Sequence, residues 1–141
     1  MEMPVTCHGT VELRGLRLDT RIGTYGPGDV VPDEHVLDMT LSISPDLILT
    51  QQDGMANVFD YDPLLAQIER LARDGHYETQ EWLITRIVNV CASDPQIQAV
   101  EIVLRKSPVL AGSGSLGVRL TVDQQTLADI RRASGQQHTY L

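Results

Sequence analysis

The chain has 141 residues, 42% of them hydrophobic and 4% aromatic, and a formal net charge of −8, so it suits a single domain with an aliphatic core and not a disordered chain. This acidic balance disfavours a nucleic-acid partner, because contacts to phosphates need clustered Lys and Arg side chains. No apolar run is long enough to span a membrane, and the first residues lack the pattern of a signal peptide, so we expect a cytoplasmic protein.

Two strands open the predicted fold. Residues 10–22 contain alternating apolar positions, and the change of parity beside Gly15 predicts a β-bulge at that glycine. Residues 23–32 hold three Gly and two Pro and are predicted to form a loop. Residues 35–44 alternate apolar and polar side chains, which is typical of a strand with one buried face, and His35 at its start is expected to be half-exposed.

Two helices follow an irregular polar segment at residues 51–61. Asp62 suits the N-cap and Pro63 the first position of a helix that ends near Gly75. The second helix is predicted over residues 79–92, where apolar positions recur with helical spacing. Both helices therefore have an apolar face to pack against a sheet.

Two more strands and a tail complete the chain. The strands are predicted over residues 97–106 and 116–122, joined by a loop rich in Gly and Ser. In the second of them, Leu116, Val118, Leu120 and Val122 are expected to face inward. We expect one domain over residues 1–124 and a tail over residues 125–141 that is helical in part and then polar and loose.

This order of elements predicts an α+β fold. Two antiparallel strand pairs flank the helices, so two helices are inserted between the second and third strands of a four-stranded antiparallel sheet. A sheet of this size has two open edges, which another subunit can cover.

Three side chains are candidates for chemistry. Lys106 stands at a strand end on the core-facing parity, so it either extends its amine to solvent or lies in a polar pocket, where it can act as an acid or position a water. Glu81 lies in the first turn of a helix, where the helix dipole favours a carboxylate, and such a group can also receive paired N–H donors from a heterocycle. Tyr61 precedes the first helix and is either a packing residue or a surface on which a flat ring stacks.

The sequence has no metal or phosphate motif. Its four histidines show neither HxH nor HExxH spacing, so no metal ligand set is expected. The glycines of residues 23–28 follow no parallel strand and open no helix, unlike those of a phosphate-binding loop. Cys7 and Cys91 lie far apart, outside any CxxC pair, and are expected to be free thiols.

In their order and spacing, several segments resemble the dihydroneopterin aldolase family. The run over residues 11–18, followed by Ile22-Gly23, resembles the opening strand of that family. Asp53 and the later Phe59-Asp60-Tyr61 resemble the segment before its first helix. Glu81 with its amphipathic helix resembles the family's pterin anchor. Two other tunnelling-fold families fit less well, because zinc-dependent pterin synthases need a His cluster and nitrile-reducing relatives need a reactive Cys in a site loop.

The later strands extend the resemblance. The strand that ends at Lys106 resembles the one that carries the family's catalytic lysine, and Gly117-Val118 fits the strand after it. The similarity covers about residues 11–122. It implies a tunnelling fold, in which four subunits form a ring, two rings stack into an octamer, and the sites lie between neighbouring subunits. A homo-oligomer, either tetramer or octamer, is therefore expected.

The resemblance also implies roles for residues. Glu81 would hold the 2-amino-4-oxo edge of a pterin, Tyr61 would stack on the ring from the adjacent subunit, and Lys106 would act through an ordered water in proton transfer. Gln80 and Tyr25 complete the expected substrate-binding residues. No metal or other cofactor is implied, because the C6=N5 imine of the substrate itself accepts electrons when the C1′–C2′ bond breaks.

The implied activity is that of a lyase in folate-type pterin biosynthesis. It would cleave 7,8-dihydroneopterin, or a related dihydropterin, to 6-hydroxymethyl-7,8-dihydropterin and glycolaldehyde. One alternative is epimerisation at C2′ of dihydroneopterin or its phosphate, which uses the same groups. A third is a pterin-binding subunit with little or no catalysis.

The sequence departs from the family pattern at two places. The family usually has a Glu five residues after the Ile-Gly of the first strand, and here that position is Gly28. Asp29, one place further on, is the candidate for its catalytic role, and Glu34 is the other nearby carboxylate. In addition, Ser107 separates Lys106 from the proline that usually follows the lysine.

Overall fold

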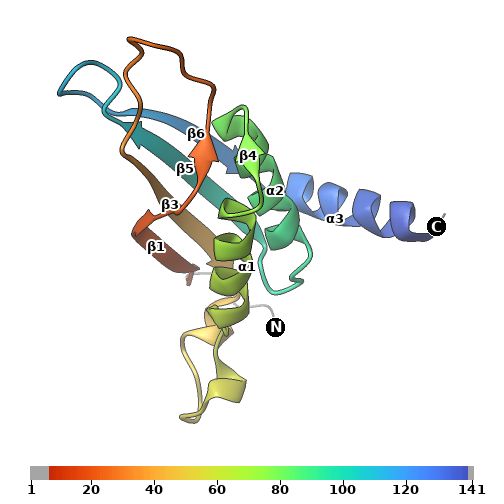
Figure 1. Ribbon diagram of the computed structural model, residues 1–141. Coiled ribbons are helices and arrows are strands. Elements are labelled where there is room, and N and C mark those ends of the chain that lie inside the picture. The colour runs from red at the N-terminus through yellow and green to blue at the C-terminus, as the bar shows by residue number, and fades with distance from the viewer. Residues whose placement is uncertain (1–6, 140–141) are drawn as a thin grey trace.

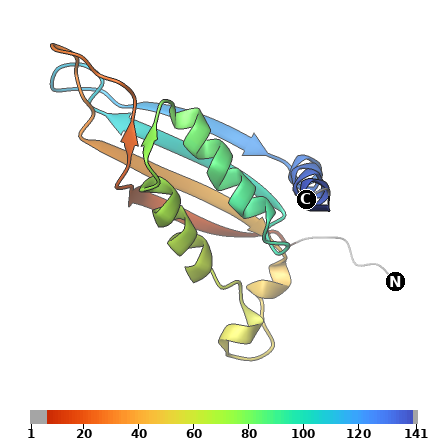
Figure 2. The same cartoon turned by 45° about the vertical axis from the view of Figure 1, so that its right-hand side comes forward.

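The computed structural model describes residues 7–139, with side chains to residue 135. It has an antiparallel sheet of four strands in the order β1 (Gly9–Arg17), β3 (Glu34–Ile43), β5 (Ala99–Ser107) and β6 (Leu116–Val122). Two helices, α1 (Asp62–Ala72) and α2 (Gln80–Ala92), join β3 to β5 and cover one face of the sheet (Figure 1 and Figure 2). The predicted α+β class with a four-stranded antiparallel sheet is therefore confirmed.

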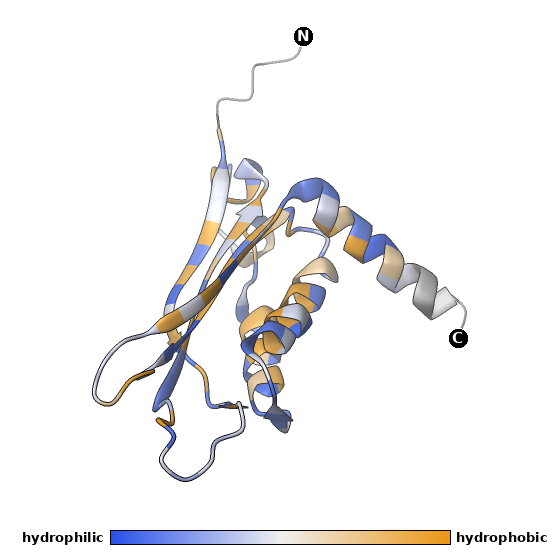
Figure 3. Ribbon diagram, turned by 90° about the horizontal axis from the view of Figure 1, so that it is seen from above, coloured by the Kyte–Doolittle hydropathy of each residue, from blue (hydrophilic) through white to orange (hydrophobic). Residues whose placement is uncertain are grey.

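The core lies between this face of the sheet and the two helices, where apolar residues gather (Figure 3). Every second residue of β3, from His35 to Ile43, is buried, as the alternation predicts. Opposite them on β5, Val100, Ile102 and Leu104 are buried beneath the two helices. Burying an aliphatic side chain of this size contributes about 1.5–3 kcal/mol, so this layer holds the sheet and helices together.

Gly15 forms the predicted β-bulge in β1. The pairing register with β3 shifts between Leu13 and Leu16, and Gly15 has a φ of +70°. Its N–H donates to Oδ1 of Asp38 at 2.7 Å. That hydrogen bond, followed by the one from Arg105, holds the pKa of Asp38 below its usual value.

The first strand is shorter than predicted. Strand β1 ends at Arg17, where the chain leaves the main sheet. Residues Arg21–Ile22 form a separate strand, β2, that pairs in parallel with β4 (His76–Tyr77). A single strand over residues 10–22 is therefore wrong. The reason is tertiary, because Ile22 and Tyr77 are both buried in the core at this junction.

Helix α1 also begins differently from the prediction. Asp62 is its first helical residue and Tyr61 its N-cap, and the Tyr61 side chain makes no capping hydrogen bond. Asp60 supplies the acceptor instead, because its Oδ1 accepts a hydrogen bond from the N–H of Asp62 at 3.1 Å. For α2 the predicted start at Thr79 is one residue early, since Thr79 is the N-cap.

The C-terminal segment is a regular helix, α3 (Gln124–Thr139), which projects from the domain (Figure 1 and Figure 3). Leu127 is fully buried, and the guanidinium of Arg131 donates to three main-chain carbonyls, those of Ala92, Asp94 and Ile97, at 2.6–3.1 Å. The helix that the sequence predicts for part of this segment extends as far as Thr139, and residues 140–141 lie outside the described chain. No helix in the described chain has both the length and the apolar character that crossing a bilayer requires.

The edge strand β6 has the predicted parity but not the predicted burial. Its register places Leu116, Val118, Leu120 and Val122 opposite the inward residues of β5. Leu116 is nevertheless 49% exposed and Leu120 42% exposed, while Val122 is buried. The reason is that α1 and α2 pack on the middle of the sheet and leave much of this edge uncovered.

Candidate active site

One end of the sheet brings together the start of β3 and the end of β5. His35 pairs with Lys106 in register, and Glu34 pairs with Ser107. The loop over residues 23–33 is tied to this end, because the N–H of Asp33 donates to the Ser107 carbonyl at 2.8 Å. We call this region the site end, defined by loop 23–33, His35, Lys106 and the first turn of α2.

Lys106 has a free ammonium group at the site end. Its side chain is partly exposed, and within the described chain it forms no hydrogen bond or ion pair with another side chain. Two carboxylates of β3 are paired with other side chains: Glu34 with Arg17 at 3.2 Å, and Asp38 with Arg105. The ammonium is therefore available to a ligand or a water.

The start of α2 carries Glu81 to the same end of the sheet. Thr79 begins the helix by accepting the N–H of Trp82 at 3.1 Å. The buried Gln80 donates from Nε2 to the carbonyl of Leu104 at 3.2 Å, which fastens this turn to β5 two residues before Lys106. Glu81 is exposed and forms no ion pair within the described chain, so its carboxylate can receive donors from a ligand near the positive end of the helix dipole.

Loop 23–33 folds on itself around Tyr25 and Asp29. Oδ2 of Asp29 accepts the N–H of Gly26 at 2.7 Å, and the Asp29 N–H donates back to the Gly26 carbonyl at 3.1 Å. The ring of Tyr25 lies against Gly23, where an added β-carbon would be 2.9 Å from it. Gly28 has a φ of +85°, which side chains of L-residues rarely adopt, so this backbone favours glycine where the family pattern has Glu.

Tyr61 lies at the other end of the domain. Strand β3 runs away from the site end, and α1 starts near its far end and runs back toward the site end (Figure 2). Tyr61, at the start of α1, is 51% exposed. One chain therefore brings Lys106, Glu81 and Gln80 together, with Tyr25 and Asp29 in the adjoining loop, but leaves Tyr61 apart.

His35 is a site-end residue that the sequence did not single out. It is only 6% exposed rather than half-exposed, and its buried Nε2 has no hydrogen-bond partner in the structure. Burial, and then the positive charge of Lys106, lower its pKa. Its position in the sequence could have predicted this burial, because His35 continues the alternation of inward-facing residues along β3.

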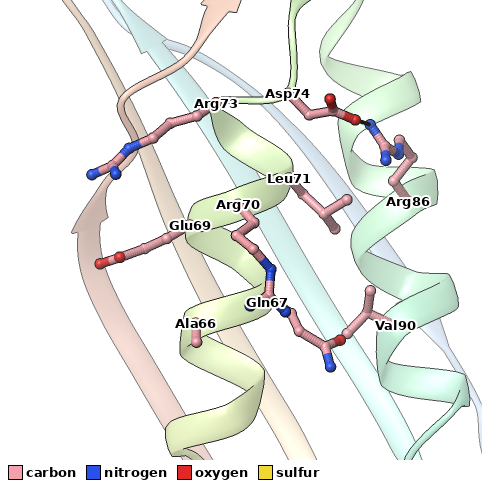
Figure 4. Close-up of a pocket in the computed structure, with 9 residues that line it drawn as sticks. All are labelled: Ala66, Gln67, Glu69, Arg70, Leu71, Arg73, Asp74, Arg86 and Val90. Carbon is pink, nitrogen blue, oxygen red and sulfur yellow. Dashed lines mark hydrogen bonds and ion pairs between the residues drawn. The ribbon is translucent and has the colours of Figure 1, made fainter.

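A pocket of about 810 Å3 lies away from this region, in the groove between α1 and α2 (Figure 4). None of its nine lining residues is a predicted site residue. Among them, Arg86 donates to Asp74 at 2.7 Å and to Tyr77 Oη at 2.8 Å, so its guanidinium is already committed. We therefore place the candidate chemistry at the site end and not in this groove.

The described residues contain no group of three or more His, Cys, Asp and Glu side chains that could hold a metal ion. The two cysteines are free thiols, as predicted, with Cys7 exposed and Cys91 buried. Burial raises the pKa of Cys91 to about 12, so this thiol is protonated and unreactive at neutral pH.

Comparison with known proteins agrees with this architecture. The FolB family model for dihydroneopterin aldolase matches residues 11–121. Among solved structures, the dihydroneopterin aldolase of Burkholderia thailendensis bound to guanine has a TM-score of 0.68 and 20% identity, and the match covers 81% of this chain and 89% of that one. The Escherichia coli dihydroneopterin aldolase in complex with neopterin has a TM-score of 0.68 and 17% identity, over 80% of this chain and 97% of that one. No curated protein matches the sequence.

Proposed function

Because the chain belongs to the dihydroneopterin aldolase family, we propose that it is a lyase that cleaves 7,8-dihydroneopterin, or a closely related dihydropterin, to 6-hydroxymethyl-7,8-dihydropterin and glycolaldehyde. The observation that carries this proposal is the pair of unpartnered charges at the site end. Lys106 and Glu81 have opposite charge and come from different elements, and the Gln80–Leu104 hydrogen bond joins those two elements.

In this proposal Glu81 recognises the substrate. The 2-amino-4-oxo edge of a pterin presents two parallel N–H donors, which match the two oxygens of a carboxylate. Neopterin and guanine, the ligands of the two solved aldolases, both have such an edge. The free carboxylate of Glu81 suits this contact because no residue in the described chain has to be displaced from it.

Lys106 serves the bond-breaking step. The 2′-hydroxyl loses its proton, the C1′–C2′ bond breaks, and the electron pair moves into the C6=N5 imine as N5 gains a proton, which gives an enol. Protonation of this enol at C1′, with loss of the N5 proton, then forms 6-hydroxymethyl-7,8-dihydropterin. The leaving fragment is glycolaldehyde. An ammonium group at the end of β5 can supply or relay a proton through a bound water, and a positioned proton-transfer group typically contributes on the order of 10²- to 10⁴-fold in rate.

A second subunit would complete the site. Tyr61 lies at the opposite end of its own chain, so stacking on the substrate requires Tyr61 of a neighbouring subunit. The uncovered edge strand β6, with Leu116 and Leu120 exposed, supports assembly through the sheet edges. We propose a homo-oligomer with its sites between subunits.

Two measurements test the proposal. Turnover of 7,8-dihydroneopterin is followed by chromatography of 6-hydroxymethyl-7,8-dihydropterin, and neopterin binding is measured by calorimetry. Glu81→Gln should weaken neopterin binding about 10- to 100-fold, because it removes a hydrogen-bond acceptor that carries charge. Glu78→Gln, an exposed position before the helix, is the control and should leave binding unchanged. Failure to bind any 2-amino-4-oxo heterocycle would rule out the proposal.

A pterin-binding subunit without efficient catalysis is the second candidate. The observation that favours it is the loop, where Gly28 supplies no carboxylate and the Asp29 carboxylate is bonded to Gly26. Tight neopterin binding with no product would select this function. Epimerisation at C2′ uses the same groups as cleavage, and it is distinguished by the appearance of the C2′ epimer in the product mixture. Asp29→Asn tests whether that carboxylate takes part, since unchanged turnover would exclude it.

A further inference from the structure

His35 and Lys106 form a cross-strand pair on the helix-covered face of the sheet. They stand directly opposite each other in the antiparallel pairing of β3 and β5. The β-carbons of such pairs lie about 4.5–5.5 Å apart, so the two side chains leave the sheet side by side. The lysine stem is long enough for its ammonium group to reach the neighbouring ring.

One nitrogen of the His35 imidazole, Nε2, lacks a partner within the described chain. The residue is 6% exposed, and Nε2 is buried with no hydrogen bond. A buried polar atom left unpaired costs about 1–3 kcal/mol, so a donor that can reach it is stabilising. The ring is neutral at pH 7, because burial and the charge of Lys106 lower its pKa, and one ring nitrogen of a neutral imidazole is an acceptor.

Among the charged side chains of the neighbouring strands and the first turn of α2, Lys106 is the donor without a partner. On the neighbouring strands, Arg17 is paired with Glu34 and Arg105 with Asp38. On α2, Glu81 is an acceptor and cannot donate to the ring. The Lys106 ammonium has three donor hydrogens and no side-chain partner within the described chain.

We propose that His35 is a positioning residue for Lys106, accepting a hydrogen bond at Nε2 from the Lys106 ammonium group and so holding that group toward the substrate. A neutral acceptor suits this role, because a carboxylate in its place would neutralise the lysine charge, whereas imidazole fixes the position and leaves the charge available. The catalytic part of this inference rests on the proposed aldolase function, but the hydrogen bond itself does not.

The kinetic test compares His35→Phe, His35→Gln, Lys106→Met and the double variant His35→Phe/Lys106→Met. His35→Phe keeps a flat ring without an acceptor, and it should lower kcat on the order of 10²-fold because the lysine is misplaced. KM and the affinity for neopterin should stay within about twofold, since substrate binding is not what the pair provides. His35→Gln restores an acceptor oxygen and should recover part of kcat. The double variant should be no slower than Lys106→Met alone.

Ile43→Val is the matched control. Ile43 is buried on the same face of β3 at its other end, so this change perturbs the same layer without touching the pair. It should keep the wild-type kcat. An unchanged kcat in His35→Phe, or losses that multiply in the double variant, would overturn the positioning role. If His35→Phe lacks a cooperative melt, the positioning role is judged instead from the kcat of His35→Gln relative to that of Ile43→Val.

A spectroscopic test keeps this inference separate from the proposed function. Nitrogen-15 NMR of the free wild-type protein at pH 7.5 should show Nε2 of His35 as the unprotonated, hydrogen-bonded nitrogen. Lys106→Met should shift that resonance toward the position of a nitrogen without a hydrogen bond. A proton on Nε2, or no shift in Lys106→Met, would refute the pair. A wild-type protein that turns over no dihydropterin while passing this test would instead reject the aldolase proposal.

Discussion

Introducing the acidic residue of the family pattern at position 28 should not create an active site in this chain, and it should destabilise the protein. Gly28 has a φ of +85°, and no atom lies within 4 Å of the place where its β-carbon would be. Gly28→Glu therefore meets no steric clash, and its whole cost is backbone strain of about 1–2 kcal/mol. Because Asp29 fixes the loop through Gly26, the new carboxylate is also not expected to point toward Lys106.

Urea unfolding at one fixed protein concentration measures this strain, because the stability of an oligomer depends on concentration. Gly28→Ala should lose nearly the same free energy of unfolding as Gly28→Glu, while Gly28→Asn should lose less, since Asn tolerates this region of backbone conformation better. Turnover of 7,8-dihydroneopterin by Gly28→Glu should not exceed that of the wild type. A variant as stable as the wild type that gains turnover would show that the loop adopts a different conformation and that the reasoning is wrong.

Three further predictions concern stability and assembly. The pKa of His35 is below its ordinary 6.5, so as the pH falls the unfolded chain binds a proton at this histidine before the folded chain does. The contribution of His35 to the free energy of unfolding should therefore be fully present above about pH 6.5 and decrease as the pH falls below it. Thermal melts from pH 7.5 to 5 should show a smaller loss of stability in His35→Phe. Arg131→Ala removes three hydrogen bonds to carbonyls and should cost about 2–4 kcal/mol in urea unfolding, whereas Arg132→Ala, which breaks only an exposed pair with Asp129, should change stability by less than about 0.5 kcal/mol. Leu120→Lys on the uncovered edge strand should yield a smaller species by light scattering, while Asn89→Lys on the exposed face of α2 should not, and equal masses would exclude β6 from the interface.

The parts of the fold set by local pattern could be predicted from the sequence. The alternation along β3, the bulge at Gly15 and the limits of β6 at residues 116–122 follow from side-chain parity and glycine placement. The pairing of β2 with β4 could not be predicted, because each strand has two residues and they meet only through tertiary packing. The continuous helix of α3 was missed for a similar reason, since its docking depends on Arg131 reaching carbonyls about 35 residues earlier in the chain.

The members of the candidate site stay predictions, and the structure shows how the elements that carry them are arranged. Lys106 and Glu81 were selected by position and resemblance, and the structure brings their elements together. The separation of Tyr61 from them depends on the direction in which α1 crosses the sheet, which residue spacing alone does not reveal. His35 was passed over because a histidine at a strand start is usually part exposed, and only its pairing with Lys106 makes it distinctive.

The hydrogen bond from Gln80 to the Leu104 carbonyl bears on how such a site can diversify. It lies in the core and joins the helix that carries Glu81 directly to the strand that carries Lys106, and no surface loop takes part in it. Loop 23–33 and the β5–β6 connection can therefore change in length or composition while the anchor and the lysine keep their spacing. Under the proposed function, descendants of this chain could acquire new preferences for the pterin side chain by loop substitution, whereas a change at Gln80 would alter recognition of every substrate at once.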